Sequence, residues 1–278
     1  MKIELASSYG FCYGVKRAIE IAEKHQNSFT YGPLIHNKDE IKRLKDGFNI
    51  GLVENIDDVK DDNTVVIRTH GIPKDELAIL KKQDNEVIDA TCPYVTTPQN
   101  IVAKMSSEGY SVVIFGDKEH PEIKGVVSYA EHQEHTFIVL HPEELGMLRL
   151  KNKVALVSQT TKKPEDFVKI VDALITTHKE VRVFNTICNA TFENQDAAAD
   201  LAEKADVMIV IGGKHSSNTK MLHSISQQSC PESYLIENEK ELEEHWFKNK
   251  QLCGISAGAS TPDWIVQNVI NKIEKIIN

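Results

Sequence analysis

Residues 86–100 have the sequence EVIDATCPYVTTPQN, in which a strand-like apolar run ends at Cys92 and a helix-compatible stretch follows. The same order occurs twice more, because KIELASSYGF precedes Cys12 and VRVFNTI precedes Cys188. Binding groups gather where strands end and helices begin in α/β proteins. Unpaired N–H groups at a helix N-terminus also lower the pKa of a thiol. The three cysteines are therefore candidate thiolate ligands, and they would converge if the three copies packed around an axis.

The alternation of apolar runs and helical stretches continues along the whole chain. Each cysteine is followed by a helical stretch, an apolar run with a loop rich in Gly, His and polar residues, and then a second helix and another strand. The later half of each copy repeats as well, as TVVIRTHGIP, KVALVSQTTKKP and QLCGISAGASTP. Strands that alternate with helices favour parallel sheets. We predict an α/β fold of three pseudo-repeated domains with small, mostly parallel sheets.

Domain boundaries are predicted close to the cysteines, at residues 13–91, 92–187 and 188–278. The third copy has no strand after its last helix, whereas residues 1–12 have the missing pattern. We therefore expect the N-terminal strand to complete the third domain. A single doubly wound sheet would produce a similar alternation, and it stays the alternative.

Composition argues against several classes of protein. The formal net charge of −9 disfavours a nucleic-acid-binding surface, which needs clustered Lys and Arg. No apolar segment approaches the length of a membrane span, and Glu4 interrupts the first apolar stretch, unlike a signal peptide. The five cysteines include no Cys-x-x-Cys pair, which favours reduced thiols. We expect a cytoplasmic protein with neither nucleic-acid nor membrane partners.

The loops that follow the apolar runs contain many small hydrogen-bonding side chains. They are His36, His70, His120, Glu122, Gln159, Thr160, Ser216, Ser217, Asn218 and Ser260. Such a lining suits an oxyanion such as phosphate or diphosphate, held by side-chain donors and helix N-termini. The chain has neither a Walker A lysine pattern nor a GxGxxG turn, so a nucleotide cofactor is poorly supported.

Three thiolates leave one coordination position of a metal centre open, and two chemistries fit. Zinc with three thiolates and a water would support hydrolysis. A 4Fe-4S cluster with three cysteine ligands would leave one iron open to substrate. Spacing does not choose between them, and a non-catalytic anion-binding protein with packed cysteines is a third possibility. Cys230 and Cys253 fall outside the repeated position and are expected to pack as small apolar residues.

A set of ordered motifs carries a resemblance: GFCYGVKRAI, LIHN, RTHGIP, DATCPYVTTP, GDKEHPEIKG, SQTT, ICNAT, GGKHSSNTKML and SAGASTPDWIVQNVI. Over essentially the whole chain they resemble the 4-hydroxy-3-methylbut-2-enyl diphosphate reductase (IspH/LytB) family. The resemblance implies a cloverleaf of three α/β domains around one 4Fe-4S cluster per chain, with three Cys ligands and one open iron. It also implies a two-electron, two-proton reduction that removes the substrate hydroxyl. The products would be isopentenyl and dimethylallyl diphosphates, in the last step of the methylerythritol phosphate route to isoprenoids.

The resemblance also assigns roles to residues at matching positions. Cys12, Cys92 and Cys188 look like the cluster ligands, and Glu122, with Thr160 beside the substrate hydroxyl, looks like the proton-delivery group. The residues that look like the substrate-binding shell are His36, His70, His120, Gln159, Thr160, Ser216, Ser217, Asn218 and Ser260, with His120 also counted as catalytic. His215 departs from the family pattern, where Asn is frequent, which leaves open whether it contacts the ligand. The implied electron donor is a transiently bound ferredoxin or flavodoxin.

Overall fold

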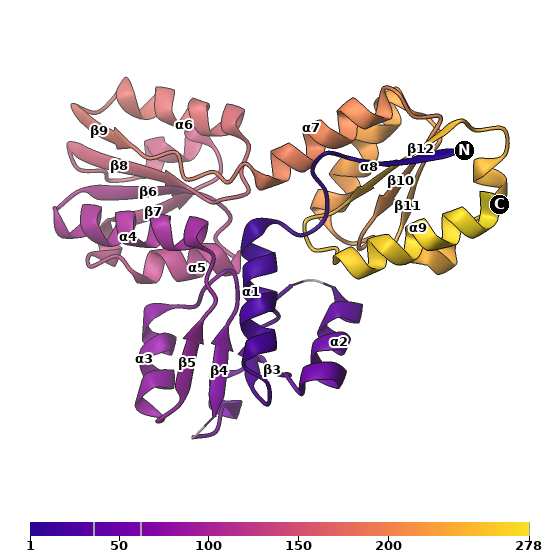
Figure 1. Cartoon of the computed structure of the whole chain (residues 1–278). Helices are drawn as coiled ribbons and strands as arrows, with labels where there is room; N and C mark the ends of the chain where they lie inside the picture. The colour runs from indigo at the N-terminus through magenta and orange to yellow at the C-terminus, as the bar shows by residue number, and fades with distance from the viewer. Residues whose placement is uncertain (36, 62, 278) are drawn as a thin grey trace. The chain divides into compact units, whose positions relative to one another are not determined.

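The computed structural model describes residues 1–35, 37–61 and 63–277, without the side chains of Thr191 and Ser217. In these ranges the chain forms three small sheets, each of four parallel strands, together with α-helices (Figure 1). The predicted α/β class and parallel sheets are confirmed, and the single doubly wound sheet is wrong. The predicted arrangement of three domains around an axis stays a prediction.

The first sheet has the strand order β3-β2-β4-β5. Its strands are β2 (Phe29–Tyr31), β3 (Gly51–Val53), β4 (Thr64–Ile67) and β5 (Glu86–Asp89). The helices of this part of the chain are α1 (Tyr13–Lys24), α2 (Lys38–Phe48) and α3 (Lys74–Lys82). Short 3₁₀ turns here and in the rest of the described chain are Ile56–Asp58, Gln133–His135, Pro142–Met147, Glu239–Glu241 and Glu244–Phe247.

The second sheet has the strand order β7-β6-β8-β9. Its strands are β6 (Ser111–Phe115), β7 (Thr136–Val139), β8 (Lys153–Ser158) and β9 (Glu180–Val183). The helices are α4 (Pro93–Ser107), α5 (Pro121–Ser128) and α6 (Pro164–Ile175). Proline occupies the first turn of all three of these helices, where its missing N–H breaks no helical hydrogen bond.

The third sheet joins the two ends of the chain. Its strands are β10 (Val207–Ile211), β11 (Ser233–Ile236), β12 (Leu252–Ala257) and β1 (Lys2–Leu5), in the order β11-β10-β12-β1. Its helices are α7 (Ala190–Ala202), α8 (Ser217–Ser229) and α9 (Asp263–Ile277). The N-terminal strand pairs with β12 from Lys2 opposite Leu252 to Leu5 opposite Ile255, so it takes the place of the missing fourth strand.

All three sheets share one topology. The strand order is second, first, third, fourth, if β1 is counted as the fourth strand of the third sheet. The chain therefore changes direction across the sheet between the first and third strands. In open parallel sheets, ligands bind at the carboxyl ends of the strands beside such a switch point. The loops after β2, β4, β6, β8, β10 and β12 are consequently the places to look for a site.

The chain packs as two compact units. Unit 1 comprises residues 1–16, 35–47 and 189–278, and unit 2 comprises residues 17–34 and 48–188. Unit 1 thus holds the third sheet and nearly all of α2, and unit 2 holds the first and second sheets. The strands of each sheet fall inside one predicted range, but the boundaries at residues 13, 92 and 188 stay a prediction.

Helices cover the central strands of the sheets. Every residue of β6 and of β10 is buried, as expected for parallel strands that are covered on both faces. In α9 the buried residues Ile265, Val266, Val269 and Ile273 recur every three or four positions and pack on the third sheet. In the described part of the chain, no helix is long and apolar enough to span a bilayer.

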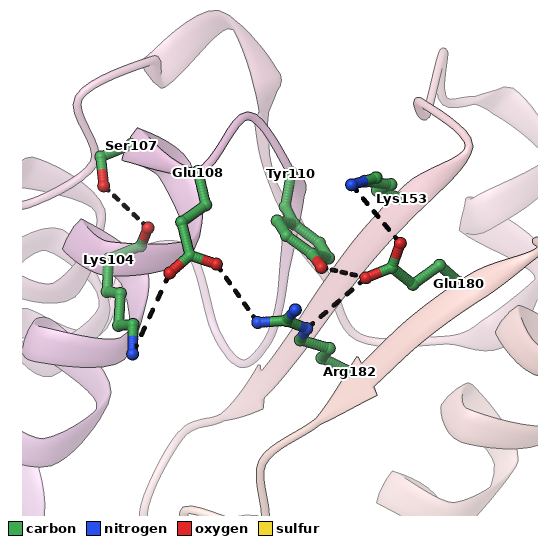
Figure 2. Close-up of polar contacts among 7 residues, drawn as sticks. All are labelled: Lys104, Ser107, Glu108, Tyr110, Lys153, Glu180 and Arg182. Atoms are coloured by element: carbon green, nitrogen blue, oxygen red, sulfur yellow. Dashed lines mark hydrogen bonds and ion pairs between the residues drawn. The ribbon is translucent and has the colours of Figure 1, made fainter.

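A charged network holds the amino ends of the second sheet (Figure 2). The hydroxyl of Tyr110, just before β6, donates a hydrogen bond to Glu180 Oε1 on β9. The Arg182 guanidinium lies 4.8 Å from the Tyr110 ring centroid and donates to Glu108 Oε2 at 3.2 Å. Lys153 Nζ, at the start of β8, lies 3.6 Å from Glu180 Oε2. Glu180 therefore has cations around it at the end of the sheet opposite the switch point.

Candidate functional site

The predicted ligand residues follow the first and third strands of the sheets. These residues are His70 after β4, His120 and Glu122 after β6, Gln159 and Thr160 after β8, Ser216 and Asn218 after β10, and Ser260 after β12. Ser217 also follows β10, at the start of α8, and the last candidate, His36, follows β2 in sequence and lies outside the described residues. The topology thus explains why residues so far apart in sequence belong to equivalent loops.

Each of the three repeated cysteines follows the fourth strand of its sheet, and its backbone N–H is held in the same way. The hydrogen bonds are Cys92 N to Thr69 O at 3.0 Å, Cys188 N to Thr160 O at 2.7 Å and Cys12 N to Ala259 O at 3.4 Å. Every acceptor lies in the loop after the third strand of the same sheet. The fold therefore ties each cysteine to one of the loops that carry the polar candidates.

The cysteines fall into two groups by burial. Cys12, Cys92 and Cys188 are partly exposed, whereas Cys230 and Cys253 are buried, as packing residues should be. Burial raises the pKa of the Cys253 thiol to about 12 and also raises the pKa of Cys230. These two thiols thus stay protonated, and metal ligation requires a thiolate.

The three repeated cysteines are divided between the two units. Cys12 belongs to unit 1, and Cys92 and Cys188 belong to unit 2. Among the described residues, no three His, Cys, Asp or Glu side chains form a group that could hold a metal ion. The case for a metal centre therefore rests on the donor set, because three partly exposed thiols in equivalent positions fit a thiolate-bound iron–sulfur cluster.

Glu122 and Thr160 form a buried polar pair in unit 2. Glu122, in the first turn of α5, is 1% exposed, and Thr160 is 7% exposed. The Thr160 N–H donates to Glu122 Oε1 at 2.8 Å, and the Thr160 hydroxyl donates to Oε2 at 2.6 Å. Both carboxyl oxygens are thus held by one residue of the neighbouring strand-end loop.

The surroundings of Glu122 favour its protonated form. Burial raises the pKa of its carboxyl group, and the two hydrogen bonds from Thr160 oppose this rise without cancelling it. No cation contributes to the shift, unlike the usual case of a buried ion pair. A buried carboxyl group with a raised pKa is suited to hold a proton and to give it up during a reaction.

Two histidines lie together at this end of unit 2. The ring centroids of His70 and His120 are 5.5 Å apart, and the rings meet edge to face. His120 caps α5, because its Nδ1 accepts the Glu122 N–H at 3.2 Å. The neutral His120 ring then carries its proton on Nε2, which makes Nε2 a hydrogen-bond donor.

The loop that carries His70 is fixed by a glycine. Gly71 has a φ of +70°, and a Cβ there would stand 2.9 Å from Gln99 Nε2, so no larger residue fits without strain. The Arg68 Nε donates to the Gly71 carbonyl at 3.3 Å, which closes the turn. His70 is therefore held on a tight turn and not on a long loop.

The Gln159 side chain already has partners within the protein. Its Oε1 accepts the Asp117 N–H at 2.9 Å, and its Nε2 donates to Thr161 Oγ1 at 3.1 Å. These bonds connect the loop after β8 to the loop after β6. Gln159 thus supports the loops of Thr160 and His120, and a direct contact with a ligand stays a prediction.

In unit 1 the first turn of α8, which follows the loop after β10, contains polar atoms that lack partners among the described residues. Both polar atoms of the Asn218 side chain and Thr219 Oγ1 are buried, and none of them has a hydrogen-bond partner among the described residues. A buried polar group without a partner costs about 1–3 kcal/mol. Thr219 packs closely against Gly258, because a Cβ there would stand 2.5 Å from Thr219 Oγ1. The first turn of α8 is therefore suited to receive a polar ligand.

The other unit 1 candidates have simpler surroundings. Ser216 is the N-cap of α8, where its hydroxyl accepts the Thr219 N–H at 3.3 Å, so it also has a structural role. Ser260 lies in the turn between β12 and α9 and is partly buried. The side chain of Ser217 lies outside the described ones. The α8 N-terminus is thus a site of backbone donors beside Asn218.

One supporting residue, Asn194 on α7, was missed by the sequence analysis. It is 3% exposed, accepts a hydrogen bond from the Ser8 hydroxyl at 2.5 Å and donates to the Gly10 carbonyl at 3.4 Å. These contacts hold the loop that leads to Cys12. The one signal in the sequence is that Asn194 follows the ICNAT motif, which contains Cys188. The neighbouring residues in the sequence do not indicate a contact with the N-terminal loop.

Comparison with known proteins gives consistent results. Residues 3–274 match the family model described as LytB protein. A protein of Sulfurovum sp. (strain NBC37-1), named 4-hydroxy-3-methylbut-2-enyl diphosphate reductase, is 75% identical over 276 residues, which cover 99% of this chain and 100% of that protein. A protein of the same name from a Nitratiruptor species is 63% identical and covers 99% of each chain.

Two solved structures are similar over almost the whole chain. One is described as (E)-4-hydroxy-3-methyl-but-2-enyl diphosphate reductase, the terminal enzyme of the non-mevalonate pathway; it has a TM-score of 0.85 and 41% identity and covers 99% of this chain and 100% of that one. The E-1-hydroxy-2-methyl-but-2-enyl-4-diphosphate reductase from Plasmodium falciparum has a TM-score of 0.80 and 30% identity, with 97% and 86% covered. Because the family model, the relatives and the solved structures all match along nearly the full length, the chain belongs to the LytB family.

Proposed function

We propose that this chain is a 4-hydroxy-3-methylbut-2-enyl diphosphate reductase, an oxidoreductase of isoprenoid biosynthesis. Two electrons and two protons would convert the substrate into isopentenyl or dimethylallyl diphosphate and one water molecule. Relatives of that name match the chain over its whole length, at up to 75% identity among those described above. The observation that carries the proposal is the threefold repetition of one cysteine position, each tied to a loop with candidate ligands.

The family implies an iron–sulfur enzyme, and we assign one 4Fe-4S cluster per chain to Cys12, Cys92 and Cys188. Soft thiolate donors in three equivalent positions support this assignment. When bound, a cluster with three cysteine ligands supplies electrons and one iron that can act as a Lewis acid. Cys230 and Cys253 are not assigned to it, because burial keeps their thiols protonated.

Glu122 is assigned the proton-delivery role. Its carboxyl group is buried, has a raised pKa and contacts the Thr160 hydroxyl at 2.6 Å. A protonated Glu122 can donate to the Thr160 oxygen while the Thr160 hydroxyl donates onward to the leaving group of the substrate. The pair would thereby convert a poor leaving group, hydroxide, into water.

The polar loops of both units are assigned to the diphosphate. We propose that seven residues bind its oxygens: His36, His70, His120, Ser216, Ser217, Asn218 and Ser260. Gln159 and Thr160 are also assigned to substrate binding. The unpartnered amide of Asn218 supports this role in unit 1. The diphosphate is remote from the bond that breaks, so its binding energy would serve to orient the allylic alcohol.

Electrons would come from a transient protein partner, a ferredoxin or flavodoxin. Neither a Walker A pattern nor a GxGxxG turn occurs in the sequence that could bind a nicotinamide or flavin nucleotide. The reduced cysteines fit the cytoplasm, where thiols stay unoxidised. A nucleic-acid partner is not part of the proposal, since the chain is acidic overall.

The test compares Cys92→Ser with the matched control Cys253→Ser in protein purified without oxygen. Wild-type and Cys253→Ser protein should be brown, absorb near ~400 nm, contain iron and sulfide and reduce the allylic diphosphate with a chemical reductant. Cys92→Ser should lose the intact cluster and nearly all activity, because a hydroxyl is a poor iron ligand.

Three results would contradict the proposal. Colourless wild-type protein with stoichiometric zinc would support a hydrolase, and metal-free protein would support a binding protein. Loss of iron from Cys253→Ser together with its retention in Cys92→Ser would overturn the ligand assignment.

A further inference from the structure

Helix α2 lies between two strands of the first sheet in the sequence, but it packs in the unit that does not contain that sheet. In the chain it connects β2 to β3 of the first sheet, which lies in unit 2. Residues 35–47 nevertheless pack in unit 1, with the third sheet. The chain therefore leaves unit 2 after Leu34 and returns to it at Phe48. Something in unit 1 must hold this segment.

The contact that holds it centres on a buried carboxylate, Glu40. Glu40 is only 1% exposed, and its Oε2 accepts a hydrogen bond from the Trp264 indole Nε1 at 2.7 Å. Arg43, one turn later on α2, donates from Nε to Oε2 at 2.9 Å and from Nη2 to Oε1 at 2.6 Å. We call Glu40, Arg43 and Trp264 the α2–α9 latch.

The latch is a specific contact and not a general apolar one. Burying a carboxylate is unfavourable unless charged and hydrogen-bonding partners replace water, and here a guanidinium and an indole N–H do so. Removing one of the donors leaves the buried Glu40 carboxylate with fewer partners. The geometry thus permits one register of α2 on α9 and penalises others.

Both ends of the latch are close in sequence to predicted diphosphate ligands. The Glu40 N–H donates to Asn37 Oδ1 at 3.0 Å, which ties Asn37, the residue between position 36 and α2, to the first turn of the helix. Trp264 is the second residue of α9 and follows the turn that contains Ser260. That turn is held in place as well, because the Thr261 hydroxyl donates to the Ile211 carbonyl at 3.1 Å.

We propose that Glu40 is a positioning residue, which fixes the start of α2 to the start of α9 so that the chain at residue 37 moves with unit 1. This inference rests on the proposed function, because that function makes positions 36 and 260 parts of one diphosphate site. Unit 1 then carries Asn37, the residue next to position 36, together with Ser260 and Asn218 as a single body. The latch reduces the conformational freedom that the substrate must otherwise restrict on binding.

The experiment uses the holoenzyme and three variants, Glu40→Ala, Trp264→Phe and Glu40→Gln. Glu40→Ala removes the acceptor, Trp264→Phe removes only the indole N–H and its second ring, and Glu40→Gln keeps an acceptor without the charge. The KM for 4-hydroxy-3-methylbut-2-enyl diphosphate should rise about tenfold in Glu40→Ala, and less in the other two, with kcat within about twofold of the wild type.

Two further readouts do not depend on turnover. The Kd for inorganic diphosphate, measured by calorimetry, should rise in the same order as KM. Hydrogen exchange of a peptide that covers residues 38–47 should become faster in Glu40→Ala, while exchange in β6 of unit 2 stays unchanged. The matched control is Asp166→Asn, which breaks an exposed i,i+3 ion pair with Lys169 on α6 and should leave KM, Kd and exchange at wild-type values.

Each alternative result has a definite meaning. Faster exchange of residues 38–47 with unchanged KM and Kd would make the latch purely structural and overturn the positioning role. Unchanged exchange in all three variants would overturn the latch itself. If the wild-type protein failed to reduce the allylic diphosphate, the proposed function would fall, and unchanged Kd for inorganic diphosphate in Glu40→Ala would then overturn this inference separately.

Discussion

The two ends of the second sheet place glutamates in opposite environments. At the carboxyl end, Glu122 is buried against the neutral donors of Thr160, and burial raises the pKa of its carboxyl group. At the amino end, Glu180 is partly exposed, and the Tyr110 hydroxyl, Lys153 and Arg182 lower the pKa of its carboxyl group (Figure 2). The pKa of one residue type is thus raised at one end of the sheet and lowered at the other. The difference comes from burial and from whether cations are present.

The largest effect on turnover is expected from the replacement of Glu122, at the carboxyl end of the second sheet. Glu122→Gln keeps the shape of the side chain and an acceptor for Thr160 but carries no transferable proton. We expect kcat to fall by roughly 10²-fold or more while KM changes little. Steady-state kinetics with the allylic diphosphate measures both. Near-normal turnover would remove Glu122 from the proton-delivery role, and Glu180→Gln, at the other end of the sheet, should retain wild-type kinetics.

A smaller loss is expected from the partner of Glu122. Thr160→Val removes the hydroxyl that donates at 2.6 Å but keeps the backbone N–H that donates at 2.8 Å. Because one of two bonds to the carboxyl group remains, we expect kcat to fall about tenfold, within the range for one group in a proton-transfer step. Thr160→Ser restores the hydroxyl and should recover most of the activity. Equal loss in both variants would point to packing and not to proton relay.

The strand-end loops were predictable because the sequence pattern is local. An apolar run followed by Gly, His and Ser gives both the strand and its binding loop, so His70, Glu122, Thr160 and Asn218 could be named without coordinates. The pairing of β1 with β12 was predictable as well, since only the third copy lacked a fourth strand. The relation between Glu122 and Thr160 was expected from the family resemblance, and its distances and burial were not.

The supporting contacts could not be predicted, since they join residues with no shared pattern. Nothing near Glu40 in the sequence indicates burial, and a charged residue in an amphipathic helix is normally solvated. Its partner Trp264 is more than two hundred positions away. The assignment of α2 to unit 1 also contradicts the simple rule that a helix packs on the sheet whose strands it connects. Tertiary contacts of this kind are visible only in the folded chain.

Protein stability should depend on pH through Glu122 in a defined direction. A carboxyl group whose folded-state pKa is raised above its ordinary value of 4.5 contributes stability that is fully present below 4.5. That contribution is lost as pH rises through the folded-state pKa, because the buried group must then ionise. Chemical unfolding of the wild type and of Glu122→Gln should therefore show the variant gaining stability relative to the wild type as pH rises above about 4.5. A constant difference across this range would show that the burial of Glu122 does not shift its titration.

The smallest effect is expected on protein stability, from Glu180 at the amino end of the second sheet. Its dependence on pH should have the opposite sign to that of Glu122. The folded-state pKa of Glu180 is lowered from 4.5, so its contribution to stability is present above 4.5 and is lost as pH falls through the folded-state pKa. Glu180→Gln should therefore be slightly less stable than the wild type near neutral pH, and this deficit should disappear on acidification. Because the Glu180 carboxylate is partly exposed and screened by solvent, we expect a fall in Tm of at most about 3 °C. Salt should reduce this fall, while the pH effect at buried Glu122 should persist in salt. A deficit at Glu180 that grew on acidification would mean that its ion pairs with Lys153 and Arg182 do not hold the end of the sheet.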